Sequence, residues 1–337
     1  MAMPRVAING FGRIGRLSFR ANIENPVLDV VAINDLGGPV QAAHMLKYDS
    51  VFGRFNGTVE ARENSIVVNG KEIKVFSERD PEQLPWAQEN IDVVLECTGV
   101  FRKMETASLH IKAGAKLVVV SAPGKGEVPI PTYCYGVNHE SYTPDQSVIS
   151  NASCTTNCLA PLAKVIDREY GIKNAMVTTV HAYTSSQALV DAGHKDLRRS
   201  RAAALSAIPA KTGATRAVGL VLPQLQGKFF GMAVRIPLPT VSLVDLVVNL
   251  EKPTTAEEVN EVFKKAAASD LKGVLEVNVE PLVSVDFQGN PHSSIVDADY
   301  TRVLDGTTLK VLAWYDNEWG YSNRLNEMAA FAWQKKA

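Results

Sequence analysis

Residues 5–35 read RVAINGFGRIGRLSFRANIENPVLDVVAIND, and the order of patterns in this stretch decides the fold. A short apolar run stops at Gly10, apolar residues at helical spacing follow, and a second apolar run ends at Asp35. A strand, a helix and another strand in this order form the unit from which parallel sheets are built. We therefore predict that a parallel sheet begins here.

The glycines of this stretch, Gly10, Gly12 and Gly15, have the spacing G-x-G-x-x-G. The first permits a tight turn, the second lets the backbone approach a pyrophosphate, and the third allows close contact between helix and strand. Asp35 stands where a carboxylate hydrogen-bonds ribose hydroxyls and repels the 2′-phosphate of NADP. A loop that merely needs glycine would show the same triplet, but the strand–helix–strand context favours a dinucleotide site for NAD.

Further patterns extend this first half into a doubly wound, Rossmann-type parallel sheet. The predicted features are strands over residues 92–97, 117–121 and 148–150, a helix over 103–113 and a hairpin turn at 69–70. The second half has longer strands and few helices, which predicts an α+β domain with a mixed, largely antiparallel sheet covered on one face. Its predicted elements are strands over 175–181, 230–236, 241–250 and 309–315 and helices over 256–269 and 322–335.

The composition of the 337 residues is that of an ordinary globular protein, with 46% hydrophobic and 21% charged residues. The net charge of −1 provides no basic field for nucleic acid or a membrane surface, and the apolar runs are too short to span a bilayer. Four cysteines are too few for a disulfide framework and favour a reducing compartment. The N-terminus shows no signal-peptide core, so we expect a cytoplasmic protein.

Cys154 and His181 are the candidate catalytic residues. Cys154 lies where a strand ends and a helix begins, so the helix dipole and free N–H groups are expected to stabilise its thiolate. His181 ends an apolar strand and is the natural base for such a thiol. Two plainer interpretations remain open at this point, namely a cysteine that only packs the helix start and a structural histidine. Cys158 lies inside the same helix, and no second pair has zinc spacing, so we predict no metal site.

Other polar residues around these two suit an anionic substrate. Ser153, Thr155 and Thr156 add hydroxyl donors at the helix start. Residues 182–207 form a long polar segment directly after His181, which favours a site or a subunit contact over a merely solvated face. Thr212, Gly213 and Arg235 are further candidates for phosphate contacts, through a hydroxyl, an unhindered N–H group and a guanidinium fork.

The sequence resembles the phosphorylating glyceraldehyde-3-phosphate dehydrogenase family. The matching stretches run from one end of the chain to the other: INGFGRIGR (8–16), LKYDS (46–50), ECTGVF (96–101), SNASCTTNCLAP (150–161), DLRRSRAA (196–203) and WYDNEWGYSNR (314–324). The resemblance implies an NAD-binding Rossmann domain over residues 1–153, a catalytic domain over 154–317 and a C-terminal helix over 318–337 that packs back on the first domain. It also implies a homotetramer.

The same resemblance assigns roles to single residues. Cys154 would be the nucleophile and His181 would activate it. The residues implied for NAD are Arg13, Ile14, Asp35, Arg79, Ser121 and Asn317, the last through the nicotinamide amide. Those implied for the attacking inorganic phosphate are Ser153, Thr155, Thr212 and Gly213, and those for the phosphate of the substrate are Thr184 and Arg235, with Arg199 near both.

Two departures from the family pattern are present. Ala192-Gly193 stands where NAD-specific relatives carry Leu-Pro, and together with Leu36-Gly37-Gly38 it leaves NADP open as a second cofactor. Ser186 replaces an acidic residue that is common near the site for the substrate phosphate.

The expected reaction is the reversible oxidation and phosphorylation of glyceraldehyde 3-phosphate to 1,3-bisphosphoglycerate, used in glycolysis or gluconeogenesis. It would pass through a hemithioacetal and a thioester on Cys154, because a thioester keeps the acyl group activated. An erythrose-4-phosphate dehydrogenase and a non-catalytic dinucleotide-binding scaffold are the alternatives.

Overall fold

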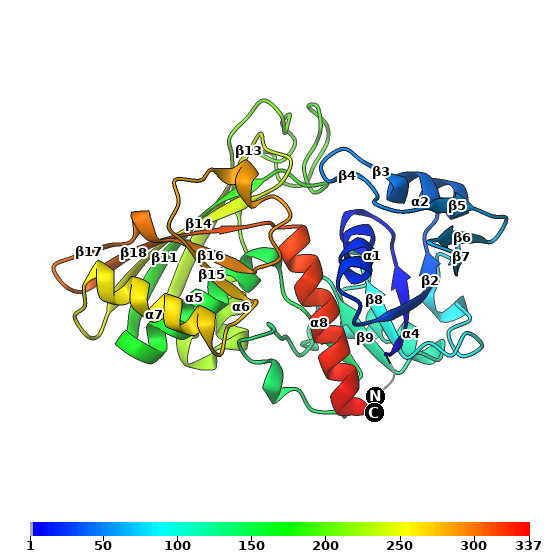
Figure 1. The fold of residues 1–337 in the computed structure, drawn as a ribbon, viewed down its shortest axis with the longest axis horizontal. Helices are drawn as coiled ribbons and strands as arrows, with labels where there is room; N and C mark the ends of the chain where they lie inside the picture. Colours follow the sequence, from blue (N-terminus) through cyan, green and yellow to red (C-terminus); the bar gives the residue numbers. More distant parts are fainter. Residues whose placement is uncertain (1–2) are drawn as a thin grey trace. The chain divides into compact units, whose positions relative to one another are not determined.

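The computed structural model describes residues 3–337, which divide into two compact units. The first unit contains the residues up to 135 together with 139–152 and 322–337, and the second contains 136–138 and 153–321. The last helix of the chain, α8 (Trp319–Lys336, red in Figure 1), begins in the second unit, and its residues from 322 onward belong to the first. Among residues 3–337, no helix is both long and apolar enough to cross a membrane.

The first unit is built on a sheet with strand order β10-β9-β8-β1-β2-β7-β6-β5 (Figure 1). Its strands are β1 (Arg5–Asn9), β2 (Asp29–Asn34), β5 (Val59–Ala61), β6 (Ser65–Val68), β7 (Lys71–Phe76), β8 (Val93–Glu96), β9 (Leu117–Val120) and β10 (Val148–Ser150). Neighbours from β10 to β7 are parallel, and β6 and β5 continue the sheet in antiparallel pairing. The chain winds outward in both directions from β1, which confirms the predicted doubly wound sheet.

The helices of this unit are α1 (Arg13–Glu24), α2 (Gly38–Lys47), α3 (Met104–Ala107) and α4 (Leu109–Lys112), and the short strands β3 (Tyr48–Asp49) and β4 (Gly53–Arg54) pair with each other. The predicted hairpin is confirmed, with Asn69 and Gly70 at φ of 50° and 82°. The single predicted helix over residues 103–113 is wrong in one respect. The chain forms two short helices, because the Ser108 hydroxyl bonds the carbonyl of Met104 and the turn tightens there, with the N–H of Ile111 reaching the carbonyl of Ser108.

The C-terminal helix α8 supplies part of the core of the first unit. Leu325, Met328 and Ala329 on one of its faces are fully buried, in the same cluster as Val6 and Ile8 of β1. Each large apolar side chain buried in this way contributes about 1.5–3 kcal/mol to stability.

The second unit is built on a mixed sheet with strand order β12-β13-β11-β14-β18-β16-β15, and β17 also pairs with β18. Its strands are β11 (Ile172–Ala182), β12 (Ile208–Lys211), β13 (Phe229–Ile236), β14 (Ser242–Leu250), β15 (Leu275–Asn278), β16 (Ser294–Asp297), β17 (Arg302–Leu304) and β18 (Thr308–Tyr315). Its helices are α5 (Cys154–Tyr170), α6 (Ala214–Val221) and α7 (Ala256–Ala268). The pairs β11–β13 and β15–β16 are parallel and the other pairs are antiparallel, as predicted.

One face of this second sheet is covered by α5, α6 and α7 (Figure 1). On β11 and β13, by contrast, Met176 and Phe230 are exposed to 69% and 73%. Exposed apolar side chains of this size on neighbouring strands are typical of a surface that another molecule covers.

Candidate active site

Cys154 is the first residue of α5, as the sequence predicts. Ser153 is the N-cap, and its hydroxyl accepts a hydrogen bond of 3.1 Å from the backbone N–H of Thr156. Ala152, just before it, has a φ of 56°, a conformation that residues other than glycine seldom adopt. This turn sets the Cys154 side chain at the positive end of the helix dipole.

His181 is the histidine that the fold brings to this cysteine. Its Nε2 atom lies 3.5 Å from the Cys154 sulfur, although the two residues come from different elements, β11 and α5. His181 is buried, whereas Cys154 is partly exposed. A ring nitrogen at hydrogen-bond distance from a thiol is the arrangement of an activated nucleophile.

The hydrogen bonds of the imidazole fix which of its nitrogens faces the thiol. Nδ1 lies 2.7 Å from the carbonyl oxygen of Ala182, which only accepts, and 2.9 Å from Nη1 of the Arg235 guanidinium, which only donates. The same oxygen accepts a bond of 3.0 Å from the guanidinium of Arg235. With the proton on Nδ1, toward the carbonyl of Ala182, Nε2 presents its lone pair to the Cys154 sulfur, and this is the tautomer that a base for this thiol requires.

Both members of the pair have pKa values that favour the neutral form. Burial, together with the positive charge of Arg235, lowers the pKa of His181 to about 3. Burial also raises the pKa of the Cys154 thiol, and the charge of Arg235 and the hydroxyl of Thr155 oppose this only in part. The expectation of a stabilised thiolate is thus corrected, because desolvation outweighs the helix N-terminus.

Tyr315 is a member of this site to which the sequence analysis gave no role. Its hydroxyl lies 2.9 Å from the hydroxyls of Thr155 and Thr179, and its ring packs edge-on against His181 with centroids 6.0 Å apart. The Thr155 hydroxyl is therefore held by a protein partner and lies 4.0 Å from the Cys154 sulfur. The only sequence signal for Tyr315 was its place in the stretch 314–324.

Ser242 joins the histidine strand to Asn317, the residue implied for the nicotinamide amide. Its hydroxyl accepts a bond of 3.1 Å from the N–H of Ala182, next to His181, and donates to Oδ1 of Asn317 at 2.9 Å. Both Ser242 and Asn317 are buried. The orientation of the Asn317 side chain is thereby tied to the strand that carries His181.

Several residues implied for phosphate binding meet beyond His181. The Thr184 hydroxyl lies 2.8 Å from that of Ser186, and the Arg199 guanidinium donates to Ser186 at 3.2 Å and to the carbonyl of Lys211 at 3.4 Å. Within residues 3–337, Nε of Arg235 is buried without a hydrogen-bond partner. A half-buried guanidinium whose Nε has no protein partner is suited to an anionic ligand.

Thr212 and Gly213, the remaining phosphate candidates, lie at the start of α6. Gly213 is the N-cap of that helix, and the Thr212 hydroxyl accepts a bond of 3.2 Å from the N–H of Ala214. The helices α5 and α6 pack against each other. The second unit thus offers a second helix N-terminus, in addition to that of Cys154, at residues implied for phosphate.

The first unit holds the predicted dinucleotide pocket, of about 430 Å³. It is lined by Asn9, Gly10, Gly12, Asn34, Asp35, Leu36, Glu78, Arg79, Cys97, Thr98, Val100 and Phe101. Gly10 has a φ of 91°, and a Cβ on Gly15 would lie 2.1 Å from the carbonyl oxygen of Gly10. A Cβ on Gly12 would meet no atom within 4 Å, so the backbone there is open to a ligand. These observations fit the turn that holds a pyrophosphate.

The carboxylate of Asp35 is fixed at the edge of this pocket. One oxygen accepts from the N–H of Phe11 at 2.8 Å and the other from the N–H of Gly37 at 3.0 Å. Each oxygen keeps lone pairs for ribose hydroxyls.

The other residues implied for NAD in this unit, Arg79 apart, lie outside the pocket lining. The guanidinium of Arg13 pairs with Asp49, so at the pocket Arg13 offers its backbone at the start of α1. Ile14 packs against the core of the unit. Ser121 is the residue after β9, and its N–H donates a hydrogen bond to the carbonyl of Glu96.

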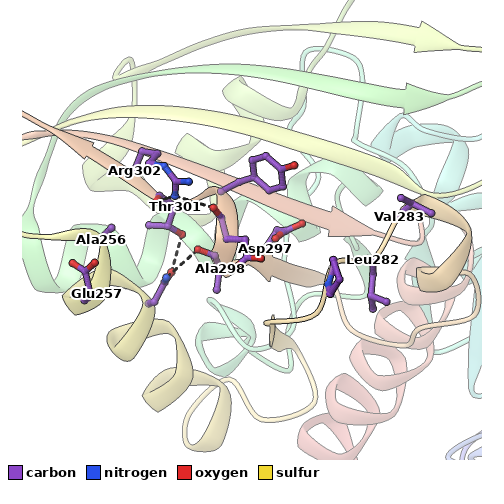
Figure 2. Close-up of a pocket in the computed structure, with 12 residues that line it drawn as sticks. Ala256, Glu257, Leu282, Val283, Asp297, Ala298, Thr301 and Arg302 are labelled. Atoms are coloured by element: carbon purple, nitrogen blue, oxygen red, sulfur yellow. Dashed lines mark hydrogen bonds between the residues drawn. The ribbon is translucent and has the colours of Figure 1, made fainter.

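A larger pocket in the second unit contains none of the predicted site residues. Figure 2 shows this cavity of about 670 Å³, where Ala256 and Glu257 at the start of α7 face Asp297, Ala298 and neighbouring residues. Its polar groups largely bond one another, since the amide of Asn260 contacts the carbonyl of Ala298 and the hydroxyl of Thr301.

Two family models match the chain. Residues 4–104 match "Glyceraldehyde 3-phosphate dehydrogenase, NAD binding domain", and residues 153–317 match "Glyceraldehyde 3-phosphate dehydrogenase, C-terminal domain". The first match covers the glycine turn and Asp35, and the second covers Cys154 and His181.

Curated relatives match along nearly the whole chain. Glyceraldehyde-3-phosphate dehydrogenase 1 of Bacillus cereus is 55% identical over 99% of both chains, and the enzyme of Geobacillus stearothermophilus is 56% identical over 97% of both. The chloroplastic glyceraldehyde-3-phosphate dehydrogenase A of Zea mays is 55% identical over 97% of this chain and 82% of its own.

Proposed function

We propose, because this chain belongs to the glyceraldehyde-3-phosphate dehydrogenase family, that Cys154 and His181 carry out the oxidation and phosphorylation of glyceraldehyde 3-phosphate with NAD. The observation that supports this most is the distance of 3.5 Å between the Cys154 sulfur and Nε2 of His181. The relatives above bear this one enzyme's name, and none of them supports the erythrose-4-phosphate or scaffold alternative.

The first step joins the substrate to the enzyme. Nε2 of His181 takes the thiol proton while the Cys154 sulfur attacks the aldehyde carbon, so that a C–S bond forms and the carbonyl oxygen becomes negative. The neutral state of both groups suits this concerted transfer, because no charge is buried before the substrate arrives. The N–H groups at the start of α5 and the newly protonated Nε2 then stabilise the oxygen of the hemithioacetal.

The second step releases the oxidised acyl group. NAD, when bound, would supply the hydride acceptor. As the hydride leaves the hemithioacetal carbon, the negative oxygen re-forms a carbonyl group, so a thioester remains on Cys154 and the thiol proton stays on His181. In our proposal Gly10, Gly12 and Asp35 hold this cofactor. Inorganic phosphate then attacks the thioester carbon, the C–S bond breaks, and 1,3-bisphosphoglycerate leaves with the thiolate regenerated.

The two phosphate groups of this reaction require two cationic or N–H-rich places. For the inorganic phosphate we propose Ser153, Thr155, Thr212 and Gly213, next to the starts of α5 and α6. For the substrate phosphate we propose Thr184 and Arg235, with Arg199 between them and the first place. The incompletely paired Arg235 supports this assignment.

NAD is the cofactor of this family, and NADP use is a secondary proposal. The fixed carboxylate of Asp35 opposes a 2′-phosphate. Leu36 and the two glycines after it, and the small pair Ala192-Gly193, leave space that bulkier residues would fill. A chloroplastic relative matches the chain about as well as the bacterial ones.

We further propose that residues 1–153 form the NAD-binding domain, that 154–317 form the catalytic domain, and that the C-terminal helix 318–337 packs on the first. A homotetramer is supported by the exposed apolar side chains of β11 and β13 and by those of the loop 183–207, such as Leu189 and Leu205. Four free cysteines support the cytoplasm as the compartment of this enzyme of glycolysis or gluconeogenesis.

The substitution Cys154→Ser tests the proposed nucleophile. We expect phosphorylating turnover to vanish, because a neutral hydroxyl is a weaker nucleophile and an oxygen ester is a poorer acyl donor. NAD affinity, measured by calorimetry, should stay unchanged. Cys158→Ser is the matched control, since its thiol is buried on Ser294 and lies outside the proposed chemistry. Equal turnover in wild type and Cys154→Ser would refute the role of Cys154.

A further inference from the structure

A chain of fully buried polar groups lies within the first unit. Glu96, at the end of β8, and His110, in α4, are exposed to 1% and 0%, and Trp86 beside them is exposed to 0%. None of these three side chains lines the dinucleotide pocket. Burying an ionisable pair is unfavourable unless its hydrogen bonds are satisfied, so the arrangement requires an explanation.

The donors around this pair define its protonation. The indole N–H of Trp86 points to Nδ1 of His110 at 3.0 Å, and an indole only donates, so Nδ1 is unprotonated. Nε2 therefore carries the proton and donates to Glu96 at 3.0 Å. His110 thus accepts a hydrogen bond from Trp86 and donates one to Glu96, so it links these two side chains.

Glu96 is surrounded by donors. The amide of Asn9 donates to the oxygen that His110 contacts, at 2.5 Å. The N–H of Thr98 donates to the other oxygen at 2.9 Å. The Thr98 hydroxyl donates to that oxygen too, and it accepts a hydrogen bond from the N–H of Val100. A protonated carboxyl group would need an acceptor here, so the pattern is that of a buried carboxylate.

These bonds continue to the lining of the pocket. Because Asn9 points its amide nitrogen to Glu96, its oxygen accepts from Asn34 at 2.7 Å. Asn34 in turn bonds both the N–H and the carbonyl of Glu78, each at 2.9 Å. A Cβ on Gly10 would lie 2.8 Å from the backbone nitrogen of Thr98, so Thr98 packs against the glycine turn.

We propose that Glu96 and His110 are positioning residues for NAD, which they affect through Asn9, Asn34 and Thr98. They hold two sides of the pocket, the backbone before Arg79 and the backbone against Gly10, in a fixed geometry before the cofactor arrives. The proposal rests on the assignment of this pocket to NAD.

The test compares Glu96→Gln and His110→Phe with the wild type. Glu96→Gln keeps the shape but turns one acceptor into an NH₂ group that faces donors. We expect it to raise the KM for NAD by about tenfold, the loss of one charge-assisted hydrogen bond. The kcat at saturating NAD and the KM for glyceraldehyde 3-phosphate should stay within twofold. His110→Phe should act in the same direction, and His110→Gln, which can still donate to Glu96, should restore most of the affinity.

Val118→Ala is the matched control, because Val118 is fully buried in β9 of the same unit and makes no bond to this network. It should lower the Tm without changing the KM for NAD. Variants of Glu96 and His110 that lower the Tm as Val118→Ala does, with wild-type KM for NAD, would overturn the proposal.

A separate variant covers the case in which neither substitution folds. Trp86→Phe removes the indole donor together with part of the buried ring, and NAD binding to it is measured by calorimetry. Weaker binding than in Val118→Ala supports the proposal, and unchanged binding overturns it. A wild type that neither binds nor reduces NAD would instead refute the assignment of the pocket itself.

Discussion

Burial raises the pKa of the Cys154 thiol and lowers the pKa of His181 to about 3, and both shifts favour the neutral side chains. Removing the base should therefore leave a thiol that must ionise into solvent by itself. We expect His181→Asn to lower kcat by about 10²–10⁴-fold, the usual contribution of a general base. The KM for NAD should stay unchanged. Steady-state kinetics measures both, and a loss below threefold would show that Nε2 does not receive the proton.

The lowered pKa of His181 also predicts how stability changes with pH. Between the ordinary pKa of 6.5 and the folded value of about 3, the unfolded chain binds a proton at this residue and the folded chain does not. The free energy of unfolding should therefore fall as the pH drops below 6.5, by roughly 2 kcal/mol at pH 5 from this residue.

Urea unfolding of wild type and His181→Asn at pH 7 and pH 5 tests that sign. Other titrating groups occur in both proteins and cancel in the difference. The variant should lose less stability than the wild type between the two pH values. Equal losses would mean that His181 takes up its proton as readily in the folded protein.

Residue types pointed to Cys154 and His181 as the candidate pair, but they did not predict the surroundings of these two side chains. Arg235 affects the pKa of both, and it reaches them because β11 and β13 pair in the register that places His181 opposite Arg235. Strand patterns predict that such strands exist, whereas their register depends on contacts across the whole sheet. The raised pKa of Cys154 was missed for the same reason, because burial is a property of the folded chain.

The start of the helix α5 has a structural role and a proposed catalytic role, and a substitution can separate the two. Ser153→Ala removes the N-cap and should cost about 1 kcal/mol of stability. It should also lower kcat, because the first turn of α5 orients Cys154. The matched control is Thr255→Ala, which removes the N-cap of α7 in a capping box with Glu258.

Thermal unfolding and kinetics on both variants distinguish the two roles. Similar decreases in Tm, with a loss of kcat only in Ser153→Ala, are the expected result. A similar kcat in both variants would show that the N-cap serves the helix alone.

Elements with a strong pattern were predicted well from local sequence. The glycine turn, the 69–70 hairpin and the helix α7 depend on neighbours within a few residues, and the structure has all three. The break in the helix over residues 103–113 was harder to predict from local sequence, because the side chain of Ser108 competes for a backbone carbonyl inside an otherwise helical pattern.

For the whole chain, the resemblance and the alternation of strands and helices predicted the two sheets, but strand patterns alone could not predict which faces remain uncovered. Met176 lies within β11 and Phe230 lies within β13, and in the sequence both resemble ordinary strand residues. Only the placement of the helices on the other face shows that they are exposed. The proposed tetramer gives these side chains a partner surface.

Phe230→Asp tests that assembly. Phe230 is exposed to 73% in the single chain, so the substitution should scarcely affect the folding of one subunit. If another subunit covers it, a buried unpaired carboxylate should weaken the interface and shift the protein to smaller species in sedimentation velocity. Val40→Asp, at the same exposure of 73% on α2, is the matched control and should leave the distribution unchanged. Identical sedimentation of all three proteins at micromolar concentration would place the subunit contact elsewhere.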